Sequence, residues 1–291
     1  MLIRTDTGAT KVKPARRRAL GHRAVRAQQQ APSARQAETV TLGGVPLTSL
    51  TEKQAAARIV ASGQAGHGEW FVTANLDHLR LYAQDAEAKR LIDCADVVVA
   101  DGTPLLWASR LAGEPLPERV AGSNMIFTLA EKAAETGARI FFLGGNPGTA
   151  EQCAAVLADT YPGLPVAGTC CPEFGFEHSE EQLSEIEEQV CAAAPDIVLV
   201  ALGFPKQDAL IERLRRVNPH PSYVGIGVSF SFVAGEIVRA PTWMHGLGLE
   251  WMHRMMQEPG RLAERYLKRD LPFGVRLFAQ VMRDERRRRG Q

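Results

Sequence analysis

The chain has 291 residues, of which 45% are hydrophobic, and a formal net charge of +1 at pH 7. These values are typical of a globular protein with one large or two small domains. No run approaches the roughly 18 uncharged apolar residues of a transmembrane helix, and the N-terminus lacks the apolar stretch of a secretory signal, so we expect a cytoplasmic protein. Five cysteines without a Cys-x-x-Cys pair favour reduced thiols over a disulfide framework or a zinc site.

Charge is unevenly distributed along the chain. Residues 1–38 hold nine Lys/Arg and two acids, and residues 254–291 hold eleven Lys/Arg and five acids, which leaves 14 bases and 26 acids between them. Basic ends on an acidic body favour an anionic partner: a membrane surface, a nucleic acid or a phosphorylated lipid. Residues 1–38 contain few large apolar residues and are predicted to be a disordered basic arm. A solvated tail without any partner is an equally good interpretation of this arm.

The folded body is predicted to begin at Thr39. Residues 40–42 and 45–47 flank two glycines and indicate a hairpin. Ser49 or Thr51 can cap a helix through Ala55 to Ile59. Strands and helices then alternate. The predicted strands are residues 70–74, 97–100, 139–143, 166–168, 197–202 and 223–226. The predicted helices include residues 77–83, 105–111, 124–135, 150–160, 180–193 and 207–217.

This alternation predicts an α/β fold. Strands separated by helices favour a Rossmann-like, largely parallel sheet with helices on both faces, which we assign to residues 39–240. Residues 241–291 show no further strand pattern and are rich in Arg, Trp and Met. We expect them to form a helical, basic appendage that associates with a membrane, with Trp and Met on its apolar side.

Asp101 is the first candidate for chemistry. It follows the β-branched run Val97–Ala100 and precedes Gly102 and Pro104, so it lies at the carboxyl end of a predicted strand. Ligands bind at this edge of open α/β sheets, which makes a carboxylate there a candidate acid or base. The alternative interpretation is that Asp101 caps the next helix.

Two more predicted strands end in polar or glycine-rich segments. Thr73 and Asn75 follow the strand at 70–74, and both side chains can hydrogen-bond a sugar or a nucleotide. Gly144 and Gly145 begin a turn that opens a helix, where backbone amides can receive an anion. A purely structural turn explains these glycines almost equally well.

The remaining two strand ends contribute a lysine and a glycine whose backbone is accessible to a ligand. Gly203 is followed by Lys206 and Gln207 in the first turn of a helix, where a lysine is unfavourable unless it faces a bound phosphate. Gly227, after the last strand, lets a ligand approach the backbone closely. Together the five strand ends predict a pocket for a nucleotide-linked sugar.

Motifs of several other enzyme classes are missing from the sequence. It has no phosphate loop of the Gly-x-x-x-x-Gly-Lys-Ser/Thr type, no Gly-x-Ser-x-Gly, no His-Glu-x-x-His and no dinucleotide fingerprint. The Asp-x-Asp metal motif of many sugar transferases is absent from the strand ends. We therefore expect cations and helix ends to stabilise a pyrophosphate leaving group, with Arg119 the best cation besides Lys206.

An ordered series of motifs resembles the WecG/TagA/CpsF glycosyltransferases from about Thr39 to Tyr266. The series is Thr73-Ala74-Asn75, Ala100-Asp101-Gly102-Thr103-Pro104, Glu118-Arg119-Val120-Ala121-Gly122, Phe142-Leu143-Gly144-Gly145, Leu202-Gly203-Phe204-Pro205-Lys206-Gln207, Arg239-Ala240-Pro241, Gly248-Leu249-Glu250-Trp251-Met252-His253-Arg254 and Glu258-Pro259-Gly260-Arg261.

The resemblance implies the inverting transfer of a sugar from a UDP-sugar donor, without a metal or a cofactor. The sugar is N-acetylmannosamine, its uronate or a related hexose, and the acceptor is a saccharide linked to a polyprenyl diphosphate. Such an enzyme builds cell-surface or exopolysaccharide, including teichoic acid-like polymers, as a peripheral protein on the inner face of the cell membrane.

The resemblance also implies roles for individual residues. Asp101 resembles the catalytic base, and Thr73 with Asn75 resembles the pair that positions the substrate beside it. Arg119 and Gln207 match substrate contacts. The arginines that close over the site and hold the diphosphate are matched by three residues of the appendage, Arg254, Arg261 and Arg265.

Two positions depart from the family pattern, and two other functions stay open. Asp208 stands where Glu is usual, and Ser229 stands where Gly is common. A sugar-nucleotide epimerase or dehydrogenase also binds UDP-sugars at strand ends, and the basic ends alone also fit a non-catalytic binder of anionic lipid. We expect no nucleic-acid partner. An apolar appendage that must be buried makes a homo-oligomer plausible.

Overall fold

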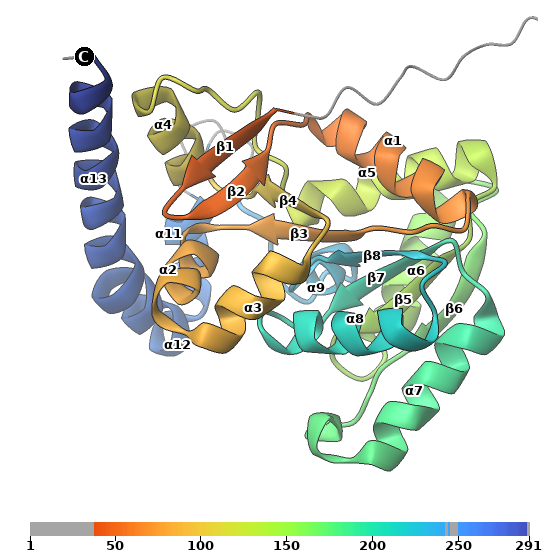
Figure 1. Cartoon of the computed structure of the whole chain (residues 1–291). Coiled ribbons are helices and arrows are strands. Elements are labelled where there is room, and N and C mark those ends of the chain that lie inside the picture. Colours follow the sequence, from red (N-terminus) through yellow and green to blue (C-terminus); the bar gives the residue numbers. More distant parts are fainter. Residues whose placement is uncertain (1–37, 242–243, 245–249, 290–291) are drawn as a thin grey trace, which may run out of the picture. The chain divides into compact units, whose positions relative to one another are not determined.

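The structure is a computed structural model that describes residues 38–241, 244 and 250–289, all within the unit Ala37–Gln291. The basic arm predicted over residues 1–38 lies outside the described residues, except for Glu38. The described part is an α/β fold built on a parallel sheet with helices packed against it (Figure 1). The predicted fold class is therefore confirmed. The predicted division at residue 240 stays a prediction.

The central sheet has the strand order β4-β3-β8-β7-β5-β6, and every neighbouring pair is parallel. The chain lays down β3 and β4 at one side, crosses to β5 and β6 at the other, and then fills the middle with β7 and β8. The strands are β3 (Trp70–Ala74), β4 (Val97–Ala100), β5 (Ile140–Gly144), β6 (Val166–Cys170), β7 (Ile197–Ala201) and β8 (Ser222–Gly225). The carboxyl ends of β4, β3, β8 and β7 consequently lie side by side.

One face of the sheet is covered by helices whose apolar sides form a single core with it. Ile59, Leu129 and Leu157 come from three of these helices and are fully buried. The helices are α1 (Glu52–Gln64), α5 (Gly122–Thr136), α6 (Thr149–Thr160) and α9 (Ser229–Val233). Thr51 caps α1, since its side chain accepts a hydrogen bond from the Gln54 amide at 3.2 Å.

A second core covers the opposite face. It includes the antiparallel hairpin of β1 (Thr39–Leu42) and β2 (Val45–Thr48), which packs beside β4. The helices of this face are α2 (Leu76–Gln84), α3 (Ala86–Cys94), α4 (Thr103–Leu111), α7 (Glu180–Ala193) and α8 (Lys206–Val217). The prediction of helices on both faces is confirmed, because each face has its own buried core.

The C-terminal segment is mostly helical where it is described. It comprises α11 (Glu250–Gln257), α12 (Pro259–Ala263), the π-helical segment η2 (Glu264–Asp270) and α13 (Leu271–Arg289). Helix α13 packs on the second core through Leu277 and Val281 and lies against α4. Of the helices described, none has the length and apolar character that a bilayer span requires.

Candidate active site

The five predicted strand ends meet at one edge of the sheet. The parallel registers place Ala74 beside Ala100, Val200 beside Gly225, and Gly144 beside Ala201. The residues that follow these strands therefore emerge on the same side of the molecule. Asp101 is held there by its own amide, which donates to the Ala74 carbonyl at 2.7 Å. This arrangement agrees with the sequence-based expectation that the candidate residues share an edge.

Asp101 does not cap the helix that follows it. Gly102, at a φ of 134°, is the N-cap of α4, and no side chain caps that helix. The backbone amide of Gly122, the first residue of α5, instead acts on the carboxylate and opposes the rise of its pKa. The alternative interpretation of Asp101 as a cap of the next helix is therefore wrong. The reason is that residues 119–122 fold back beside β4, where the Val120 amide donates to the Ala100 carbonyl at 2.8 Å.

The surroundings of Asp101 give it the proton affinity of a base that works near neutral pH. Burial raises the pKa of the Asp101 carboxyl to about 6. The positive charges of Arg119 and Arg254 oppose that rise, and the negative charge of Glu250 adds to it. A carboxylate with this pKa is mostly ionised at pH 7 and still basic enough to accept a proton from a hydroxyl during a reaction.

Arg119 is engaged by an acid from the C-terminal segment. Its Nη1 donates to Glu250 Oε2 at 2.6 Å, and its Nη2 donates to Glu250 Oε1 at 2.8 Å. Glu250 is the first residue of α11, one helical turn before Arg254. Arg254 lies over the Phe232 ring, with its guanidinium carbon 5.7 Å from the ring centroid. Its buried Nε has no hydrogen-bond partner within the described part of the chain.

Thr73 and Asn75 flank Asp101 and both serve the scaffold. The Thr73 hydroxyl donates to the Gly225 carbonyl at 3.1 Å and ties β3 to β8. Asn75 is the N-cap of α2, where its side-chain oxygen accepts from the amides of Asp77 and His78. The side-chain nitrogen of Asn75 makes no hydrogen bond to any residue that the structure describes, so it can donate to a substrate.

Gln207 is buried between two loops. Its side-chain oxygen accepts from the Gly203 amide at 3.2 Å and from the Gly227 amide at 3.1 Å. Gly203 and Gly227 have φ values of 76° and 57°, and a Cβ on either would meet no atom within 4 Å, so their backbones border open space. Gln207 therefore shapes the ends of β7 and β8, and the direct substrate contact that the resemblance implies stays a prediction.

Two other predicted anion contacts lie beside acids of the protein itself. Lys206 forms an ion pair with Glu177 and lies 5.3 Å from the centroid of the Phe174 ring. In the turn after β5, the Asn146 side chain donates to Glu236 at 2.9 Å. Gly144 and Gly145 precede that turn, and a Cβ on Gly144 would lie 2.7 Å from the Ala201 carbonyl oxygen. The glycine at 144 is thus required by close packing against β7.

Arg265 lies beside α2. Its Nη1 is 3.8 Å from an Asp77 carboxylate oxygen, and its guanidinium carbon lies 4.8 Å from the centroid of the Tyr266 ring. The pKa of the neighbouring His78 is lowered to about 4, first by burial and further by the charge of Arg265, although Asp77 opposes this. Arg261 belongs to α12, and its side chain lies outside the described part of the structure.

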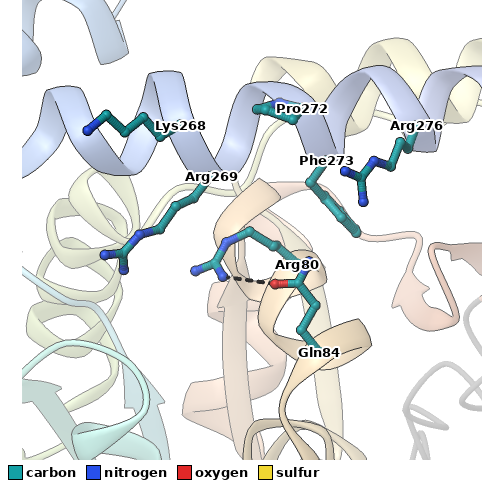
Figure 2. Close-up of a pocket in the computed structure, with 7 residues that line it drawn as sticks. All are labelled: Arg80, Gln84, Lys268, Arg269, Pro272, Phe273 and Arg276. Carbon is teal, nitrogen blue, oxygen red and sulfur yellow. Dashed lines mark hydrogen bonds between the residues drawn. The ribbon is translucent and has the colours of Figure 1, made fainter.

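A basic pocket that the sequence did not predict lies between α2 and the C-terminal helices. Figure 2 shows its lining, in which Arg80 faces the side chains of η2 and α13. The pocket has a volume of about 400 Å³, and its lining contains four cations and no carboxylate. Arg80 is fixed there by Asp77, by Asp270 at 3.2 Å and by Gln84 at 3.2 Å. The lining residues are Arg80, Gln84, Lys268, Arg269, Pro272, Phe273 and Arg276.

Sequence comparison assigns the chain to a known group of enzymes. A profile of the glycosyl transferase WecG/TagA/CpsF family matches residues 40–287. One curated relative is an N-acetylglucosaminyldiphosphoundecaprenol N-acetyl-beta-D-mannosaminyltransferase of Bacillus spizizenii. It is 31% identical over 194 residues, which span 67% of this chain and 73% of the relative. The resemblance seen in the motifs is confirmed, and the chain belongs to the WecG/TagA/CpsF family of glycosyltransferases.

Proposed function

We propose that this enzyme transfers N-acetylmannosamine, or a closely related sugar such as its uronate, from a UDP-sugar to a polyprenyl-diphosphate-linked N-acetylglucosamine saccharide. The product would enter a cell-surface polysaccharide. The relative from Bacillus spizizenii, which is named for this acceptor and this sugar, supports the choice of substrates. The observation that carries the proposal is the half-buried Asp101 at the sheet edge, with its raised pKa and two guanidinium groups nearby.

In the proposed reaction, Asp101 acts as the general base. Its carboxylate removes the proton from an acceptor hydroxyl while that oxygen attacks the anomeric carbon of the donor. The bond from the anomeric carbon to the UDP oxygen breaks on the opposite face, so a single displacement inverts the configuration. As this bond breaks, negative charge develops on the diphosphate of the leaving UDP, and nearby cations can stabilise that charge. Arg254 is suited to this role, because its buried Nε has no partner among the described residues.

The lipid-linked acceptor requires contact with a membrane surface, and the C-terminal helices offer one. Leu267, Leu271, Val275 and Met282 are between 45% and 63% exposed, and their spacings of four and seven residues place them on one side of the helix. The basic pocket of Figure 2 opens on the same helical segment. Apolar side chains beside guanidinium groups suit a bilayer with anionic phosphates. We therefore propose a peripheral enzyme on the inner face of the cell membrane.

The test is a reconstituted transfer reaction. The full chain is incubated with a panel of UDP-sugars and a short-chain polyprenyl diphosphate that carries N-acetylglucosamine, and both free UDP and the disaccharide lipid are measured. We expect UDP-N-acetylmannosamine to give the fastest release of UDP, with the β-linked inverted product. Reactions without acceptor are the control. If no UDP-sugar gives acceptor-dependent UDP release, the proposed reaction is wrong.

A further inference from the structure

We infer that Glu250 is a positioning residue for the transfer reaction, one that holds the Arg119 guanidinium away from Asp101 and so keeps Asp101 available as a base. The inference deepens the proposed function, since it rests on Asp101 being the base. Glu250 has no role in the sequence-based assignment, although it lies within a motif that the family resemblance includes.

The first support is the geometry of the ion pair. Both terminal nitrogens of Arg119 bind Glu250, at 2.6 and 2.8 Å, and the two side chains are only 17% and 24% exposed. A two-point guanidinium–carboxylate contact fixes orientation as well as distance, and partial burial reduces its exchange with water. Glu250 thus commits both terminal nitrogens of Arg119.

The second support is the position of Arg119 next to the base. Val120, the residue after Arg119, is hydrogen-bonded to Ala100, the residue before Asp101. The Gly122 amide, two residues further on, also acts on the Asp101 carboxylate and opposes the rise of its pKa. Arg119 therefore cannot move far from Asp101, and its charge acts on that carboxyl group. Asp101 nevertheless has no ion pair within 4.0 Å among the residues that the structure describes.

The third support is the balance of charge around the base. Among the described residues, the charged groups that act on Asp101 are Arg119 from the segment before α5 and Glu250 with Arg254 from α11. With Glu250 present, two cations face two carboxylates. Without it, Asp101 would be the carboxylate that acts most strongly on Arg119, ahead of Glu52, and Arg119 would pair with Asp101. An arginine paired with a carboxylate lowers its pKa by about 1–3 units. Asp101 would then be a weaker base, and Arg119 would occupy the carboxylate oxygens that must accept the proton.

The decisive measurement follows Asp101 directly and needs no substrate. The carboxyl carbon of Asp101 is titrated by NMR in the full-length wild type, in Glu250→Gln and in the control Glu114→Gln. Asp101→Asn assigns the signal. Glu114 pairs with Arg288 at 2.6 Å on the exposed surface, so the control makes the same chemical change in an ion pair elsewhere. We expect Glu250→Gln to lower the pKa of Asp101 by at least about one unit and Glu114→Gln to leave it unchanged.

A second arm tests the consequence for the reaction. In Glu250→Gln, the pH at which kcat/KM reaches half its maximum should fall along with the pKa of Asp101, and the plateau kcat should drop about tenfold or more. Arg119→Met combined with Glu250→Gln should restore part of that loss, because no guanidinium is left to pair with Asp101. An unchanged titration of Asp101 in a folded Glu250→Gln protein would overturn the inference. Failure of the transfer assay in the wild type would instead refute the proposed function.

Discussion

The side-chain oxygen of Gln207 accepts the backbone amide of Gly227 at 3.1 Å and, at the same time, that of Gly203 at 3.2 Å. One buried side chain therefore joins the loops after two neighbouring strands at the edge where Asp101 lies. A loop that contains glycine has many accessible backbone conformations, and these hydrogen bonds select one of them. Gln207 thus contributes to the site by fixing the walls of the pocket.

Replacing Gln207 with Leu should weaken both the fold and the pocket. Two amides lose their acceptor, which costs about 1–2 kcal/mol of unfolding free energy, measured by urea denaturation. We expect KM for the UDP-sugar to rise, since the loops lose their common anchor. Gln182→Leu is the control, because the Gln182 side chain, near the start of α7, donates to the exposed Glu173 carboxylate in the loop before that helix. A Gln207→Leu protein with parental stability and KM would contradict this account.

Asp101→Asn should fold normally and lose most of its turnover. The substitution keeps the size of the side chain and one carbonyl oxygen, but it removes the basic carboxylate. Loss of a general base lowers kcat by about 10²–10⁴-fold. Because burial disfavours the charged form, the variant should be at least as stable as the wild type at pH 7 in thermal denaturation. Turnover close to that of the wild type would remove Asp101 from the role of base.

The rate of transfer should depend on pH through the ionisation of Asp101. The carboxyl has its pKa raised to about 6, and only the ionised form accepts a proton. kcat/KM should therefore be constant well above pH 6 and fall about tenfold per pH unit well below it. The profile is measured by UDP release between about pH 4 and about pH 8, a range that extends about two units on each side of this pKa. A profile without a transition between pH 5 and 7 would argue against Asp101 as the titrating group.

Local sequence signals predicted the strand that positions the site and the candidate base at its end. The β-branched run at Val97–Ala100 identified a buried strand, and the rule that ligands bind at the carboxyl ends of parallel strands selected Asp101. The predicted helix at 77–83 corresponds to α2, and α3 was not predicted. Helix α2 ends at Asp85, whose backbone is extended at a φ of −129°. The Asp85 side chain then caps the start of α3.

The partners of the charged residues were not predictable in the same way. Lys206 pairs with Glu177, and Arg119 pairs with Glu250, 131 residues further along the chain. Such pairs depend on how distant segments pack, and the chain offers 33 acids to each cation. The hydrogen bonds by which Gln207 links two loops were not predictable for the same reason. Its burial follows from the approach of the β7 and β8 loops, which only the tertiary structure defines.

Asp208 should make the stability of the fold depend on pH. It is fully buried, and neither carboxylate oxygen has a hydrogen-bond partner among the residues described. Burial raises its pKa to about 7, although the nearby Gln207 and Trp70 side chains oppose that rise. An acid with a raised pKa in the folded state destabilises the fold once it ionises, so stability is lost as pH rises from about 4 to about 7.

Asp208→Asn should remove this dependence. We expect the variant to be more stable than the wild type at pH 8 by about 2–4 kcal/mol, the free energy of a shift of about three pKa units, and to be similar to it at pH 4. Urea denaturation at both pH values measures the difference. Asp159→Asn, on the exposed surface of α6, should change neither value. Equal stabilities of Asp208→Asn and the wild type at pH 8 would show that Asp208 does not ionise in the folded protein.

The C-terminal helices should bind anionic membranes through the cations of the basic pocket. Lys268 and Arg276 line the pocket, and neither forms an ion pair with any described residue. Each cation near an anionic bilayer contributes about 1 kcal/mol, so Lys268→Gln with Arg276→Gln should weaken binding to phosphatidylglycerol vesicles by about thirtyfold. The loss should shrink at high salt, because screening removes the same interaction. Lys132→Gln with Arg216→Gln, on α5 and α8, makes the same change of charge on other helices and should leave vesicle binding unchanged. If both double variants lost affinity equally, net charge alone would explain binding, and the pocket would have no specific part in it.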